Sequence, residues 1–279
     1  MSLRVEIQMN DILISDDVQN TLKEIIPLCK SDLNVISGFC KLHTLEFIDK
    51  LVSNPISKKL LVRFLPSDIT SGATDKEIYS YCKNHNWSIY IDYSIHAKTY
   101  VFDKIKCIIG SANLTDKGLG ILNKSNKEAS VCFELDNSSY LKILSLYRDA
   151  ILLDDKLYNF VISQNDDIEV VNYKNQYKSL YSISCLFPED FPSENSDLIE
   201  LYSSRSFKWL VNYLSSKESK LAYFGELSAA IHNIFVKDPR PYRKNIKQHL
   251  GDLLKCIQFC HVDAIEITRP NYSECVKLK

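Results

Sequence analysis

A histidine and a lysine two positions apart, His96 and Lys98, are the residues of this chain best suited to chemistry. They stand at the start of an apolar run, residues 97–103, whose alternating pattern predicts a β-strand. Successive side chains of a strand point to opposite faces, so an imidazole and an ammonium group at i and i+2 share one face. The sequence therefore predicts a reactive base beside a fixed positive charge.

A second polar group follows the next apolar run. Residues 107–109 are predicted to pair with residues 97–103 as a hairpin, and they end in Gly110-Ser111-Ala112-Asn113. A hydroxyl and an amide can add hydrogen-bond donors beside the histidine, while Gly110 lets the backbone approach closely.

These groups fit a phosphodiester. An imidazole can attack phosphorus and form a covalent intermediate, which divides one difficult displacement into two easier ones. A lysine and an amide can bind the non-bridging oxygens and stabilise charge in the transition state. A second histidine is then needed to protonate the leaving oxygen and to deprotonate water. Taken singly, each residue type is commonplace in packed or solvated positions, so only the joint spacing is informative.

The spacing His96-x-Lys98-x4-Asp103-x6-Gly110-Ser111-x-Asn113 resembles the HKD signature of the phospholipase D superfamily at every fixed position. The continuation, residues 114–119, is similar to the superfamily's bacterial nuclease branch, which includes some restriction endonucleases. The resemblance covers roughly residues 10–155 and implies an α/β fold of the phospholipase D-like sandwich type.

The resemblance implies a role for each motif residue: His96 as nucleophile or acid, Lys98 and Asn113 as phosphate ligands, Ser111 as a support of the site, and Asp103 as a structural residue that orients the hairpin. The family also places a glutamate on the strand after the motif. Glu128 is the candidate, with Glu134 as its competitor and an ordinary strand-start charge as the alternative reading.

Only one copy of the signature is present, whereas many superfamily members carry two and build one site from both. The other histidines lack a lysine two positions on: His43, His85, His232, His249 and His261. Members with one copy build the site across a two-fold axis. The resemblance therefore implies a homodimer through the catalytic domain, with His96 of each chain facing one phosphate.

The elements that position these residues alternate between strand-like and helical runs, which predicts an α/β layer fold for residues 1–160. Strands are expected at 34–39, 59–65, 88–92, 97–103, 107–109 and 128–135, and helices at 42–51, 75–84 and 138–153, the second of these helices with Thr74 or Asp75 near its cap. Residues 161–200 are expected to connect this catalytic domain to a C-terminal domain, residues 201–279.

The C-terminal pattern is helical and then changes period. Helices are expected at 198–214, 223–235 and 243–259, followed by strands at 264–268 and 274–278 around a Pro270-Asn271 turn. Three helices followed by a hairpin are typical of a winged helix-turn-helix, so a winged-helix-like DNA-binding domain is predicted.

Basic residues gather near the third helix: Lys237, Arg240, Arg243, Lys244, Lys247 and Lys255. The apolar residues Ile246, Leu250, Leu253 and Leu254 are expected to face inward, so that Arg243, Lys244 and Lys247 are left to contact DNA phosphates. Arg269, with Asn271 and Tyr272, is a candidate contact from the hairpin. The alternative is a solvated basic helix in a protein-interaction or dimerisation module.

Composition limits the remaining classes. A net charge of -1 gives no global signal for nucleic acid, so any such signal is local. Nine cysteines without paired spacing favour reduced thiols in a cytoplasmic protein. No apolar run is long enough to cross a membrane. Neither Cys82-x2-His85 nor Cys256-x3-Cys260-His261 makes a four-ligand zinc pattern, and the chemistry requires no metal or cofactor.

The leading hypothesis is therefore a metal-independent endonuclease that cleaves DNA, and the resemblance alone suggests a role in restriction or defence. A phospholipase or phosphatidyl transferase is the first alternative, although no lipid-docking amphipathic stretch is present. A non-catalytic DNA-binding regulator is the second, and the intact His96, Lys98 and Asn113 count against it. Arg63, after a buried strand, fits either a flanking phosphate or a buried pair with an acid.

Overall fold

The computed structural model describes residues 11–121, 125–164, 183, 185–235 and 243–279, apart from the side chain of Asn271. The chain forms two compact units. One comprises residues 1–146 and 150–170, and the other comprises residues 147–149 and 171–279.

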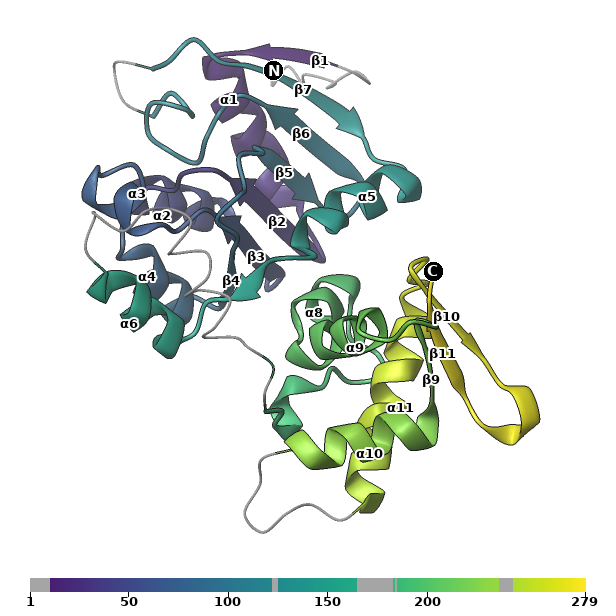
Figure 1. Ribbon diagram of the computed structural model, residues 1–279. Helices are drawn as coiled ribbons and strands as arrows, with labels where there is room; N and C mark the ends of the chain where they lie inside the picture. The colour runs from purple at the N-terminus through teal and green to yellow at the C-terminus, as the bar shows by residue number, and fades with distance from the viewer. Residues whose placement is uncertain (1–10, 122–124, 165–182, 184, 236–242) are drawn as a thin grey trace. The chain divides into compact units, whose positions relative to one another are not determined.

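The first unit is built on an eight-stranded mixed sheet (Figure 1). In sheet order its strands are β1 (Asp11–Ile14), β7 (Ala129–Glu134), β6 (Lys106–Gly110), β5 (Thr99–Phe102), β2 (Asp32–Ser37), β3 (Ser57–Val62), β4 (Trp87–Ile91) and β8 (Ile151–Leu152). The pairs β2–β3 and β3–β4 are parallel, and every other neighbouring pair is antiparallel. The α/β fold class expected from the sequence is confirmed.

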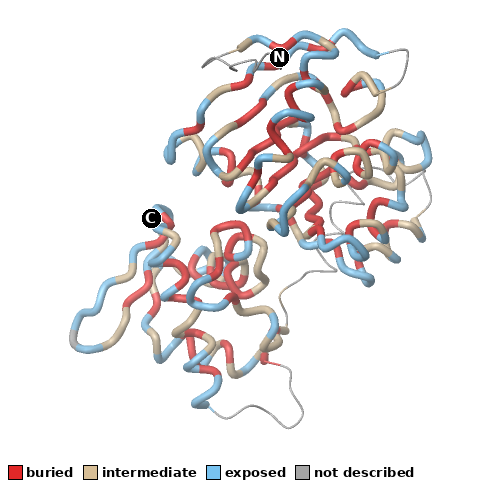
Figure 2. The backbone as a smooth tube through the Cα atoms, turned by 180° about the vertical axis from the view of Figure 1, so that it is seen from behind, coloured by how far each residue is buried: buried red, intermediate tan, exposed pale blue. Residues whose placement is uncertain are grey.

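The helices of this unit are α1 (Asp16–Ile25), α2 (Leu42–Leu51), α3 (Pro66–Thr70), α4 (Ile78–Asn84), α5 (Asn137–Leu144) and α6 (Asp155–Ser163), with short 3-10 turns η1 (Ile26–Leu28) and η2 (Ser145–Tyr147). The C-terminal parts of the central parallel strands are mostly apolar and buried, as expected for strands whose two faces are both covered. Ile36, Leu60 and Leu61 are fully buried, and these strands lie in the buried interior of the unit (Figure 2).

Two predicted helices have different bounds in the structure. The helix expected at 138–153 ends at Leu144, because Ile151 and Leu152 pair with β4 and complete the edge of the sheet. The helix expected at 75–84 begins at Ile78. Asp75 does not cap it, because its carboxylate instead accepts hydrogen bonds from Lys41 Nζ at 2.5 Å and from the Leu42 amide at 2.8 Å.

The second unit consists of α8 (Leu198–Ser203), α9 (Arg205–Ser215), β9 (Leu221–Tyr223), α10 (Phe224–Ile234), α11 (Arg243–Phe259), β10 (Ile265–Thr268) and β11 (Cys275–Leu278), with 3-10 turns η3 (Pro188–Asp190) and η4 (Pro270–Tyr272). Its strands form an antiparallel sheet in the order β10-β11-β9. The single helix expected at 198–214 is divided at Ser204, whose backbone is extended and whose hydroxyl caps α9 by accepting from the Phe207 amide at 3.2 Å.

The longest helix of this unit, α11, has the predicted bounds and the predicted inward face. Its side chains Ile246, Leu250, Leu253 and Leu254 are all buried. The strand β9 is not predicted from the sequence, because three residues give no readable alternation.

Among the described residues, no helix is both long enough and apolar enough to cross a bilayer. Each of the nine cysteines is a free thiol, and seven of them are buried.

Candidate active site

Of the predicted catalytic residues, all but Asp103 lie where four neighbouring strands of the large sheet begin or end. β2 ends at Ser37, β5 begins at Thr99, β6 ends at Gly110 and β7 begins at Ala129. Because β2, β5, β6 and β7 pair antiparallel in that order, these four strand ends lie next to one another on the same side of the sheet. The site is therefore assembled from segments that are far apart in the chain.

His96 and Lys98 lie immediately before β5 rather than within it, which differs from the predicted strand at 97–103. The His96 side chain is exposed, whereas Lys98 is only 8% exposed. The Lys98 ammonium reaches back to donate to the His96 carbonyl at 2.5 Å. This bond holds the positive charge beside the backbone that carries the imidazole.

Burial lowers the pKa of Lys98, because the charged form loses water. The Glu128 carboxylate raises this pKa and the Arg63 guanidinium lowers it, with a net shift below the ordinary value. Both groups therefore act electrostatically on the lysine, and Glu128 favours its charged form.

Glu128 precedes β7 and is 9% exposed. Its carboxylate accepts from the Ser111 hydroxyl and, at 3.0 Å, from Asn126 Nδ2. The Ser111 oxygen in turn accepts from the Ala129 amide at 3.0 Å. Glu134, the competing candidate, is exposed at the far end of β7. The structure thus brings Glu128, rather than Glu134, to the edge that carries His96.

Asn113 lies beside His96, and the observation that joins them is the environment of Gly38. A Cβ atom added to Gly38 would lie 3.2 Å from Asn113 Oδ1 and 3.6 Å from His96 Nδ1. Both atoms are therefore next to the same point, and Gly38 leaves room for them. The motif did not indicate this residue. The only sequence signal was a small Ser-Gly pair at the end of a buried strand.

Gly110 is required for the close approach of β6 to β7. An added Cβ would lie 2.0 Å from Ser130 Oγ and 2.5 Å from the Ala129 carbonyl, distances that no side chain can occupy. This close approach of β6 to β7 sets the position of Ser111, whose amide donates to the Ala129 carbonyl at 3.0 Å.

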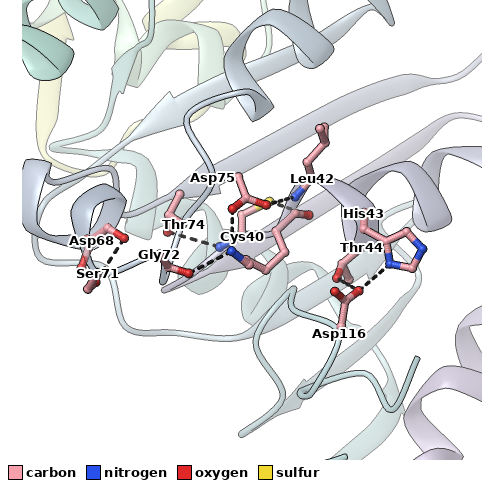
Figure 3. A network of polar contacts seen from close by, with 11 residues as sticks. Cys40, Leu42, His43, Thr44, Asp68, Ser71, Gly72, Thr74, Asp75 and Asp116 are labelled. Atoms are coloured by element: carbon pink, nitrogen blue, oxygen red, sulfur yellow. Dashed lines mark hydrogen bonds and ion pairs between the residues drawn. The ribbon is translucent and has the colours of Figure 1, made fainter. Parts of the chain in front are cut away.

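The loop after Asn113 is fastened to the start of α2, as Figure 3 shows. Asp116 accepts from the Thr44 hydroxyl at 2.8 Å and lies 2.7 Å from His43 Nδ1. The Leu114 carbonyl accepts from the Lys41 amide at 2.9 Å. These contacts fix the position of the residues that follow Asn113.

Asp103 lies at the opposite end of β5 from His96, in the turn of the β5–β6 hairpin. Its carboxylate accepts from the amides of Lys30 at 2.8 Å, Ser31 at 2.7 Å and Asp32 at 3.0 Å. Burial raises its pKa, but these hydrogen bonds outweigh burial and the net shift is downward. In the structure Asp103 orients the hairpin on the start of β2.

We expect Asp103→Asn to lower the free energy of unfolding at neutral pH by about 1–3 kcal/mol, because the amide accepts fewer hydrogen bonds than the charged carboxylate. Asparagine also tolerates the positive φ of 49° at this position. Chemical denaturation across a pH series measures the effect.

The sign of the pH dependence follows from the lowered pKa of Asp103. Its stabilisation is present above the unfolded-state value of about 3.9 and is lost as the pH falls through the folded-state pKa. The difference between wild type and variant should therefore shrink below about pH 4. A difference that grows on acidification would contradict this role.

Arg63 pairs with an acid, which is one of the two interpretations of this residue. Its Nε and Nη2 donate to the two carboxylate oxygens of Asp68 at 2.8 and 2.6 Å, and its guanidinium lies 4.7 Å from the centre of the Phe39 ring.

Among the described residues, no group of three or more His, Cys, Asp or Glu side chains is arranged to hold a metal ion.

The predicted DNA-binding residues belong to the second unit. Arg243, Lys244 and Lys247 are exposed on the first turns of α11. Arg269 precedes η4, with its Nε 3.8 Å from a Glu274 carboxylate oxygen, and Tyr272 in that turn is 94% exposed. Lys237 and Arg240 lie outside the described residues.

Comparison with known proteins finds a family match for the first unit. Residues 25–145 match the sequence profile of the family described as cardiolipin synthase, PLD-like domain. No curated protein sequence matches the chain significantly.

Solved structures similar to the chain include NucT from Helicobacter pylori, with 16% identity and a TM-score of 0.40 over 52% of this chain and 98% of that one. Nuc from Salmonella typhimurium, described as a phospholipase D family member, has 12% identity and a TM-score of 0.39 over 52% and 99%. Phosphatidylserine synthase from Haemophilus influenzae Rd KW20 has 16% identity and a TM-score of 0.45 over 62% and 44%.

Proposed function

This protein contains a phospholipase D-like domain at residues 25–145, and from that premise we propose that it is an endonuclease that cleaves DNA without a metal ion. The observation that carries the proposal is that the His96 imidazole and the Asn113 carboxamide are neighbours, since His96 Nδ1 and Asn113 Oδ1 both lie beside Gly38. The Lys98 ammonium donates to the His96 carbonyl. A nucleophile, a cation and an amide are thus available to one phosphate.

The proposed reaction has two displacements. The His96 imidazole attacks phosphorus, a P–N bond forms, the P–O bond to the leaving strand breaks, and a second imidazole gives its proton to the leaving oxygen. Water, deprotonated by that second imidazole, then attacks phosphorus and releases His96. Lys98 and Asn113 bind the non-bridging oxygens and stabilise their charge in both transition states.

The second imidazole is proposed to come from a second copy of the chain, because the signature occurs only once. An isologous dimer would place two His96 side chains on either side of one phosphate.

The dimer is tested directly with mixtures of wild-type and variant chains. When wild-type and His96→Ala chains are assembled together in varying ratios, specific activity should fall with the square of the wild-type fraction, because only dimers with two imidazoles turn over. Plasmid nicking at each ratio measures the dependence. A linear decline, or full activity in a monomer verified by sedimentation, would contradict the shared site.

DNA is proposed as the substrate because the second unit combines an exposed basic helix with a hairpin. The order α9, β9, α10, α11, β10, β11 is what a winged helix requires. Helix α11 carries Arg243, Lys244 and Lys247 on its exposed side and a continuous apolar face opposite. Such a helix suits the major groove, with its basic side chains on phosphates.

We expect Lys244→Ala/Lys247→Ala to weaken binding to duplex DNA and to reduce the slope of log affinity against log salt by about 2, one for each phosphate that a lysine no longer neutralises. Fluorescence anisotropy from low to moderate salt measures both quantities. Lys142→Ala/Lys156→Ala, which removes the same charge from exposed positions of the first unit, is the matched control. Equal effects of the two double variants would indicate a nonspecific charge effect.

The function itself is tested by incubating the protein with plasmid, single-stranded DNA and RNA in EDTA. The proposal predicts cleavage of DNA that is lost on His96→Ala. Release of headgroup from phospholipid vesicles without DNA cleavage would indicate a lipase. A mobility shift without cleavage would indicate a regulator.

A further inference from the structure

Resting on the proposed function, we propose that Ser37 is a positioning residue that fixes the Asn113 carboxamide with its NH2 group toward the phosphate. Ser37 is the last residue of β2 and is fully buried. It lies 59 residues before His96 in the chain and is absent from the motif. Its contacts all reach groups that determine where Asn113 points.

The orientation of the amide is set by donors on its oxygen. Asn113 Oδ1 accepts from the Phe39 amide at 3.2 Å and lies 3.3 Å from Ser37 Oγ. A backbone N–H can only donate, so the group facing Phe39 must be the oxygen and cannot be the NH2. The NH2 group therefore faces the other way, and within the described part of the chain no acceptor takes its protons. In the proposed function, a phosphate oxygen accepts these protons.

Ser37 holds this arrangement from both sides. Its hydroxyl donates to the Phe39 carbonyl at 2.6 Å, which fixes the residue whose N–H donates to Asn113. Its oxygen also accepts from the Leu114 amide at 2.9 Å, which fixes the residue next to Asn113. One buried hydroxyl thus ties the end of β2 to the end of the motif.

The effect on chemistry follows from preorganisation. If the carboxamide were free to rotate, its oxygen would face the phosphate part of the time and repel it. A donor already aimed at the developing charge does not have to reorganise during the reaction. Misplacing such a group by about 1 Å can cost on the order of 100-fold in rate.

A double-mutant cycle distinguishes positioning from simple stability. Wild type, Ser37→Ala, Asn113→Ala and the double variant are compared by kcat/KM on bis-p-nitrophenyl phosphate and by thermal unfolding. We expect Ser37→Ala to reduce kcat/KM on the order of 10- to 100-fold in the wild type and to have almost no further effect once Asn113 is alanine. Ser37→Thr, which keeps the hydroxyl, should restore most of the activity.

Asn113→Asp keeps the test valid if Ser37→Ala does not fold. A carboxylate retains an oxygen for Phe39 and Ser37 but has no donor for phosphate, so we expect normal unfolding and lost activity. Equal losses from Ser37→Ala in both backgrounds, or an active Asn113→Asp, would overturn the proposal. If the wild type hydrolyses no phosphodiester, the proposed function fails separately. The same cycle, measured as affinity for inorganic phosphate by calorimetry, then decides the role of Ser37.

Discussion

Replacing His96 by alanine should abolish DNA cleavage in EDTA, with a loss of at least about 10⁴-fold in kcat. Without the imidazole no covalent intermediate can form, and the remaining donors bind the phosphate without attacking it. Because the His96 side chain is exposed, its removal leaves no cavity, and thermal unfolding should be unchanged. Plasmid nicking and a thermal scan on the same preparation measure both effects.

The matched control is His261→Asn. His261 is exposed in the second unit and has a positive φ of 50°, which asparagine accepts. It should retain full activity. Cleavage in EDTA by a clean His96→Ala preparation would contradict the role given to His96.

Lys98→Ala is the second large effect, and we expect a loss on the order of 10²- to 10³-fold, mainly in kcat, because the ammonium stabilises charge that develops in the transition state. Lys98→Arg should not restore activity. The lysine is only 8% exposed and its ammonium fits against the His96 carbonyl, whereas a guanidinium is larger and planar. Rapid-quench turnover at saturating DNA measures kcat directly.

The lowered pKa of Lys98 predicts the shape of the alkaline pH profile. Activity should fall with rising pH as the ammonium loses its proton, below the ordinary lysine value of 10.5. Since Glu128 raises this pKa, Glu128→Gln should move the alkaline limb to lower pH. Since Arg63 lowers it, Arg63→Met should move the limb to higher pH. Shifts of the same sign in the two variants would show that the limb reports another group.

The motif residues could be predicted from sequence because they lie within one hairpin and its continuation. His96, Lys98 and Asn113 are separated by 17 positions at most, and short-range pairing brings them together. Glu128 could be predicted only through the resemblance to a family, since nothing in its own neighbourhood distinguishes it from Glu134.

Ser37 and Gly38 could not be predicted, because only the antiparallel pairing of β2 with β5 places them beside His96. The early end of the helix expected at 138–153 has a similar cause. Ile151 and Leu152 continue an amphipathic pattern, but the open edge of β4 binds them as a strand. In both cases a distant strand determines the outcome, and local periodicity carries no information about it.

The central claim is that an imidazole takes the phosphoryl group before water does, and the stereochemistry at phosphorus tests it most directly. A DNA substrate with one chiral phosphorothioate is cleaved in water labelled with oxygen-18. The configuration at phosphorus of the product phosphorothioate is then determined. Two in-line displacements invert the centre twice, so we predict net retention. Net inversion would mean that water attacks the phosphodiester directly, and it would contradict a covalent intermediate on His96.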